Sequence, residues 1–244
     1  MAKKLDQKEI VSFEELLMSN VIEQEALVNL LEKKGMVTKA ELLEEIKKIK
    51  NKRALRKLEI MPTVQELRVR YQPTNIKYLL LAESPPESQP HEFRFFYNPE
   101  NENKDYFFRS VMQVIFPDFK ALYRKGDKGK LLERFKEEGF FMIDAVDTPI
   151  NNMPEKERNQ QIASEINARV AEIQKLISKQ TPIFLIKKNI FNIFHPVLKE
   201  MGFNVCHDER LPFPSTGQQE RFKHKFKELL GKLGFEPKAR KGEP

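Results

Sequence analysis

The chain has 244 residues, of which 40% are hydrophobic and 32% are charged, so it can bury a core and is not expected to be disordered as a whole. Its single cysteine, Cys206, excludes an intramolecular disulfide, and the absence of a long apolar stretch or signal peptide pattern favours a cytoplasmic protein without a membrane span. The formal net charge is +7, with eight basic and two acidic residues between Arg221 and Lys241, so nucleic acid is a candidate partner.

The first part of the chain is predicted to form two helices. Apolar residues recur at helical spacing between residues 16 and 31, and Gly35 is suited to end the first helix. The sequence TKAE, starting at Thr38, has the pattern of a capping box at the start of a second helix. We therefore expect an N-terminal helical hairpin in residues 1–60. The apolar stripe over residues 12–58 needs a partner, which is the rest of the protein, another protein or a second copy of the chain.

Four continuous apolar runs follow and alternate with helical patterns. Before them, TVQE at Thr63 has the pattern of a second capping box. The runs are NIKYLLLAE, GFFMIDAV, TPIFLIKK and GFNVCHD. Continuous apolar runs are typical of strands buried on both faces, and their alternation with helices favours an α/β fold. We predict a three-layer sandwich with a mostly parallel four-stranded sheet in residues 61–235, followed by a basic tail in residues 236–244.

Polar side chains follow two of these runs directly, where ligands bind in parallel α/β sheets. Glu83 and Ser84 end the first run and precede Pro85 and Pro86, whose rings fix the backbone. A partly buried carboxylate at this position is a candidate general base, with local capping or pairing to an arginine as the alternative. Asp144 ends the second run, where an unpaired buried charge would be costly.

Aromatic residues are concentrated in HEFRFFYNP, residues 91–99. Phe96 or Tyr97 is expected to stack on a flat ring such as a nucleobase. The alternative is a hydrophobic plug that closes the end of the sheet.

The sequence PFPSTGQQERF, residues 212–222, places hydroxyl groups before a predicted helix. Ser215 and Thr216 could hold a phosphate at the helix N-terminus, and an ordinary helix cap is the alternative. Arg221 and Lys223 extend the basic surface.

No metal and no cofactor are predicted. Cys206, His207 and Asp208 are adjacent in the sequence, and neighbouring side chains of a strand point to opposite faces. The sequence also contains no P-loop and no glycine-rich dinucleotide motif.

The order of these motifs resembles that of the uracil-DNA glycosylase superfamily, over residues 75–230. AESPP is similar to the motif that positions or activates water in that family, with Glu83 on its Gln or Glu. Ser84 falls on the position often held by Asp, Asn or Ala. Phe96 or Tyr97 falls on the aromatic residue that stacks on the flipped base.

Two further motifs complete the resemblance. Asp144 falls on the Asn that reads the base edge, and the segment from Phe213 to Ser215 falls on His-Pro-Ser, with phenylalanine in place of the catalytic histidine.

The resemblance implies a DNA glycosylase that flips a damaged or deaminated base and hydrolyses its N-glycosidic bond. Water would be oriented by Glu83 or Asp144. The residues expected to contact the DNA phosphates are Ser84, Pro85, Ser215, Thr216, Arg221 and Lys223. Two alternatives are a catalytically inactive nucleic-acid-binding relative and a protein-interaction adaptor that works through the N-terminal helices.

Overall fold

The computed structural model describes residues 13–60, 63–87, 94–101, 105–123 and 127–237. The chain divides into two compact units, Met1–Met61 and Pro62–Pro244, each of which is described by itself. Residue 12 of the expected helical stripe and residues 238–244 of the expected basic tail lie outside the described residues.

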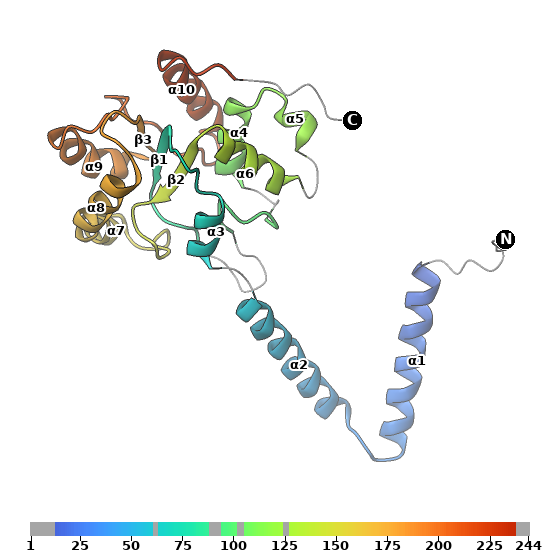
Figure 1. Ribbon diagram of the computed structural model, residues 1–244. Helices are drawn as coiled ribbons and strands as arrows, with labels where there is room; N and C mark the ends of the chain where they lie inside the picture. The colour runs from blue at the N-terminus through green and yellow to red at the C-terminus, as the bar shows by residue number, and fades with distance from the viewer. Residues whose placement is uncertain (1–12, 61–62, 88–93, 102–104, 124–126, 238–244) are drawn as a thin grey trace, which may run out of the picture. The chain divides into compact units, whose positions relative to one another are not determined.

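The first unit contains helices α1 (Phe13–Lys33) and α2 (Lys39–Ile60) (Figure 1). Gly35 lies between them with φ +66°, a conformation that glycine adopts without steric cost. The predicted capping box is present, because the Thr38 N–H donates to the Glu41 carboxylate at 2.8 Å and the Glu41 N–H donates to the Thr38 hydroxyl at 3.2 Å. Local sequence therefore defines where the first helix ends and the second begins.

Apolar side chains of these two helices remain exposed within the described residues. They are Leu17, Met18, Val21, Ile22, Leu27 and Leu30 of α1, and Leu43, Ile46 and Ile49 of α2. Exposed apolar surface of this extent is typical of an interaction site.

The second unit is an α/β domain built on a parallel sheet. Its strands are β1 (Tyr78–Ala82), β2 (Phe140–Asp144) and β3 (Ile183–Leu185), in the order β2-β1-β3. Its helices are α3 (Val64–Arg70), α4 (Tyr106–Ile115), α5 (Phe119–Leu122), α6 (Lys128–Glu137), α7 (Glu155–Ser164), α8 (Ile166–Leu176), α9 (Lys188–Glu200) and α10 (Gln219–Lys232).

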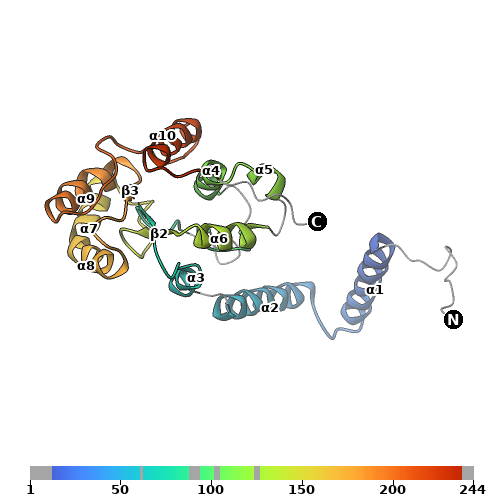
Figure 2. The same ribbon diagram turned by 45° about the horizontal axis from the view of Figure 1, so that its top comes forward.

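Helices flank the sheet on both sides. Figures 1 and 2 show α7, α8 and α9 on one side of the strands and α4, α6 and α10 on the other. All strand residues except Tyr78 are buried, as the continuous apolar runs predicted. None of the helices in the described ranges has the length and apolar character needed to cross a membrane.

The fourth apolar run lies parallel to β3 but forms only two isolated bridges with that side of the sheet. Val205 is bridged to Ile183, and Leu211 is bridged to Ile186. The segment between Val205 and Leu211 is longer than the stretch of chain that it faces, so it bulges away from a regular ladder. The sheet of the described residues therefore has three regular strands, where the sequence predicts four.

His207 explains why the ladder is interrupted. Its Nε2 accepts a hydrogen bond from the Leu185 N–H at 2.9 Å, where a regular strand would offer a backbone carbonyl. Its Nδ1 donates to the Glu209 carbonyl at 2.7 Å, which fixes the neutral tautomer. Burial lowers the pKa of His207, in keeping with a ring that accepts at Nε2.

Candidate functional site

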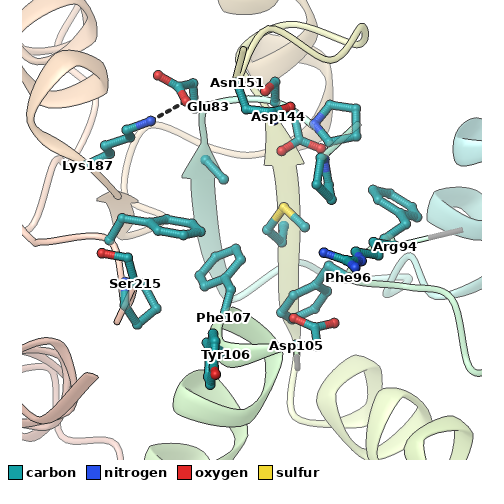
Figure 3. Close-up of a pocket in the computed structure, with 18 of the residues that line it drawn as sticks. Glu83, Arg94, Phe96, Asp105, Tyr106, Phe107, Asp144, Asn151, Lys187 and Ser215 are labelled. Atoms are coloured by element: carbon teal, nitrogen blue, oxygen red, sulfur yellow. Dashed lines mark hydrogen bonds and ion pairs between the residues drawn. The ribbon is translucent and has the colours of Figure 1, made fainter. Parts of the chain in front are cut away.

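A pocket of about 350 Å³ lies at the carboxyl end of β1 and β2 (Figure 3). Ala82 is in register with Asp144, so the strands carry Glu83 and Asp144 to the same edge of the sheet. This is where ligands gather in parallel α/β sheets, and the volume lies within the usual range for small-molecule sites.

The pocket brings together most of the residues predicted from the sequence. These are Glu83, Ser84, Pro85, Phe96, Asp144, Ser215 and Thr216. Figure 3 shows Phe107 in front of β1 and Phe96 in front of β2, with Glu83 and Asp144 at the carboxyl ends of the strands. Tyr97, Arg221 and Lys223 do not line the pocket.

Tyr97 lies in the core, which corrects the prediction that it could stack on a base. Its side chain is 0% exposed. Its hydroxyl accepts from the Met142 N–H at 2.7 Å and donates to the Met142 carbonyl at 3.2 Å. Because β2 is at the edge of the sheet, this hydroxyl satisfies backbone groups that would otherwise need another strand. Burial raises the pKa of Tyr97.

Phe96, Phe107 and Phe213 form an aromatic wall of the pocket, and Phe95 and Tyr106 also line it. The ring centroids of Phe96 and Phe107 are 5.4 Å apart, and those of Phe107 and Phe213 are 5.3 Å apart. Phe107 belongs to the first turn of α4 and was not predicted from the sequence. The only sequence signal for it is the aromatic cluster that opens this helix.

Both carboxylate oxygens of Glu83 are occupied. Oε2 accepts from the Lys187 ammonium, an ion pair that Figure 3 marks, and Oε1 accepts from the Asn189 amide. Arg158 Nε lies 3.5 Å from Oε1. The three partners were not predicted, although Lys187 lies at the end of the third apolar run and Asn189 directly follows it. Glu83 is therefore part of a compact charged cluster, and each of its oxygens already accepts a hydrogen bond from a side-chain donor.

Lys187 has an unusual backbone conformation. Its φ of 88° and ψ of 148° place it in a region that is almost restricted to glycine. It is the only non-glycine residue with positive φ among the described residues. Its N–H donates to the Leu211 carbonyl at 2.9 Å, so the sheet edge holds this strained residue between β3 and α9.

Asp144 is buried and pairs through one oxygen. Its Oδ2 accepts from Arg68 Nη2 at 3.0 Å, and among the described residues Oδ1 makes no hydrogen bond. Burial raises the pKa of Asp144 to about 6, even though Arg68 opposes this shift.

A second carboxylate, Asp147, completes this ion-pair network. It accepts from Arg68 at 2.9 Å through Oδ1 and from Arg169 at 2.9 Å through Oδ2. Burial would raise the pKa of Asp147, but the two guanidinium groups outweigh it, so that the pKa is lowered. Arg68 and Arg169 come from helices α3 and α8, and neither was predicted as part of the site.

The residues expected to bind phosphate lie in different surroundings. Ser215 and Thr216 are exposed at the pocket, just before α10. Lys223 forms an ion pair with Glu220 at 2.5 Å and a hydrogen bond with Gln113 at 3.0 Å, so its charge is already compensated.

Within the described ranges, no group of three or more His, Cys, Asp or Glu side chains is placed to hold a metal ion. Comparison with known proteins found no match to this chain, whether among protein families, curated proteins or solved structures. Function is therefore inferred from the geometry and chemistry of the site.

Proposed function

We propose that the protein is a DNA glycosylase-like hydrolase and a divergent member of the uracil-DNA glycosylase superfamily. It would take a flipped, damaged or deaminated base into the pocket and hydrolyse its N-glycosidic bond. The observation that carries the proposal is the combination of an aromatic wall and a buried carboxylate in one pocket of about 350 Å³ at the carboxyl end of the sheet. In this interpretation, residues 203–211 correspond to the fourth strand of the fold.

Asp144 is better placed than Glu83 to act on water. Only Oδ2 of Asp144 is bonded in the described part of the chain, whereas both oxygens of Glu83 have donors. With a pKa of about 6, Asp144 is ionised at neutral pH. Its carboxylate would orient the water that forms the new bond to C1′ and stabilise the positive charge on the sugar as the base departs.

The other pocket residues would bind the nucleotide. Phe107 and Phe213, which are half-buried, offer ring faces for stacking on the base, whereas Phe96 is only 4% exposed and backs this wall. Ser84, Ser215 and Thr216 line the same pocket and would donate hydroxyl hydrogen bonds to the adjacent phosphates. Glu83 would position Lys187 rather than take part in proton transfer.

A second candidate is a nucleic-acid-binding relative without catalysis. The occupied oxygens of Glu83 favour it, and so does Phe213, which lines the pocket where the resemblance expects a catalytic histidine. A role in protein contacts is a further proposal for the first unit, supported by the exposed apolar side chains of α1 and α2.

Base release is the direct test. Purified protein is incubated with labelled oligonucleotides that carry uracil, hypoxanthine, xanthine or an oxidised base, and the abasic product is cut with alkali. We expect cleavage at one lesion, and a loss of about 100-fold or more in Asp144→Asn. Asp208→Asn is the matched control, because Asp208 is exposed and does not line the pocket.

Failure to cut any lesion would contradict the catalytic proposal. If the same oligonucleotides were still bound in a salt-dependent manner, the binding relative would be the correct interpretation. If Asp144→Asn retained full activity, the assignment of Asp144 would be wrong while the reaction class would stand.

A further inference from the structure

A second hollow, the α7–α9 groove, lies beside the pocket and is larger than it, with a volume of about 640 Å³. Four basic side chains line it: Lys156 and Arg158 of α7, and Lys187 and Lys188 at the start of α9. One acidic residue, Glu155, also lines it. The groove is thus a concave surface with an excess of positive charge.

The groove and the pocket share a wall. Lys187 lines both hollows. Glu83 and its partners Lys187, Asn189 and Arg158, here called the Glu83 cluster, lie between them, with Asn189 and Arg158 on the groove side. The two hollows are therefore neighbours, separated by the ion pair between Lys187 and Glu83.

Two of the four basic side chains of the groove are already compensated, because Arg158 and Lys187 both lie within ion-pair distance of Glu83. Within the described part of the chain, Lys156 and Lys188 have no carboxylate within ion-pair distance. The lysines of α10 differ, because three of them form ion pairs, namely Lys223 with Glu220, Lys225 with Glu209 and Lys232 with Glu228. Uncompensated lysines in a hollow are suited to bind an anion.

Neutral hydrogen-bonding groups complete the lining. The carboxamides of Asn159, Gln160 and Asn192 also face the groove and can donate to phosphate oxygens. The volume of the groove exceeds the space that a single phosphate group needs, which favours an extended polyanion over a free phosphate.

We propose that the α7–α9 groove binds the phosphodiester backbone of the nucleic acid strand whose base occupies the pocket. This inference rests on the proposed function, because that function supplies the strand. Lys156 and Lys188 contact phosphates of the strand, and Lys187 stays at the wall that it shares with the pocket.

The test compares two double variants with the same net charge. Lys156→Gln/Lys188→Gln removes the two unpaired lysines of the groove. Lys130→Gln/Lys175→Gln is the control, because these lysines lie on α6 and α8 and line neither hollow. All four side chains are exposed, so both variants should fold.

Binding of a labelled single strand and of its duplex is measured by fluorescence anisotropy between about 50 and 200 mM salt. Each phosphate contact contributes about 0.7 to the salt slope for single strands and about 0.9 for duplex DNA. We expect the slope of the groove variant to fall by about 1.4 for the single strand and about 1.8 for the duplex, relative to the control variant. Inorganic phosphate at millimolar concentration should not displace the oligonucleotide.

The outcomes separate this inference from the proposed function. Equal slopes for the two variants, with base release by the wild-type protein, would overturn the groove and leave the function intact. A reduced slope without base release at any lesion would support the groove and remove the catalytic proposal. Full displacement by inorganic phosphate would overturn the backbone assignment and make the groove a free-phosphate site.

Discussion

Replacing Lys187 with glycine and, separately, with alanine isolates the backbone strain at this position. Both variants lose the ammonium group and its ion pair with Glu83, so that loss cancels when the two are compared. What differs is the cost of holding φ at 88° and ψ at 148°, which alanine bears and glycine does not.

The magnitude follows from two opposing contributions. A residue held in this region costs about 1–3 kcal/mol, whereas the greater freedom of glycine in the unfolded chain costs about 0.4–1 kcal/mol. At the midpoints of these two ranges, we therefore expect Lys187→Gly to be more stable than Lys187→Ala by about 1.3 kcal/mol. At an ordinary helix position the order is reversed, with alanine ahead by about 0.8–1 kcal/mol.

Urea denaturation monitored by circular dichroism measures the difference in unfolding free energy. The same pair of substitutions at Lys175, an exposed residue of α8, is the control and should show alanine ahead. If Lys187→Ala were as stable as Lys187→Gly, then Lys187 would carry no backbone strain and the reasoning would be refuted.

Three further predictions concern the pocket and the sheet edge. Base release should decline as the pH is lowered through about 6, because protonation of Asp144 removes its charge. A rate profile without an inflection near that pH would argue against Asp144 as the residue that orients water. The folded-state pKa of His207 is lowered, so the unfolded state binds more protons, and the unfolding free energy should decrease as the pH falls below about 6.5. His207→Phe should lose this pH dependence. Its unfolding free energy should fall by about 1–3 kcal/mol, since the Leu185 N–H is left unpaired; an unchanged pH profile would contradict this. Phe107→Ala should weaken binding to lesion-containing DNA by about 1–3 kcal/mol in a titration, and an equal loss on undamaged duplex would exclude stacking on a flipped base.

The location of the site could be predicted from the sequence because it depends on strand ends. Glu83 and Asp144 each terminate an apolar run, and parallel strands bring their carboxyl ends to one edge. The capping boxes at Thr38 and Thr63 were also predictable, because their hydrogen bonds join residues three positions apart.

The ion-pair partners could not be predicted, because they come from distant parts of the chain. Arg68 is 76 residues from Asp144, and Lys187 is 104 residues from Glu83. No spacing rule relates such positions. A charged residue at a strand end signals that a partner is needed without identifying it.

Two neighbouring aromatic residues show a second limit of prediction from the sequence. Phe96 and Tyr97 are adjacent in the sequence, and either could have faced the pocket. The Tyr97 hydroxyl bonds backbone groups of β2, so its ring is fully buried, whereas Phe96 is buried at 4% exposure but lines the pocket. The composition of the loop does not predict which of the two rings is fully buried, because that depends on which backbone groups of β2 lack a partner.

The fourth apolar run shows how one side chain can replace a regular strand. Its composition is that of a buried strand, and Val205 does lie beside Ile183. The imidazole of His207 then takes the Leu185 N–H that a backbone carbonyl would have taken. Sequence patterns describe which segments are buried, but they do not show that a side chain has taken the place of a strand in the hydrogen-bond ladder.

The roles of Glu83 and Asp144 in the pocket can be distinguished by matched amide substitutions. Glu83→Gln removes the negative charge shared by Lys187 and Arg158. We expect it to destabilise the protein by about 1–3 kcal/mol, less than for a fully buried pair, because the Lys187 side chain is 31% exposed. If Glu83 only positions this cluster, the folded variant should still release the base, whereas Asp144→Asn should bind DNA without releasing it.

The measurement is single-turnover base release, compared with the unfolding free energy of each variant. Single turnover reports the chemical step, and the unfolding curve shows that each variant is folded at the assay temperature. The opposite result, in which Glu83→Gln is folded but inactive and Asp144→Asn is active, would assign the water to Glu83. The Glu83 carboxylate would then have to accept the water at lone pairs that Lys187 and Asn189 do not use.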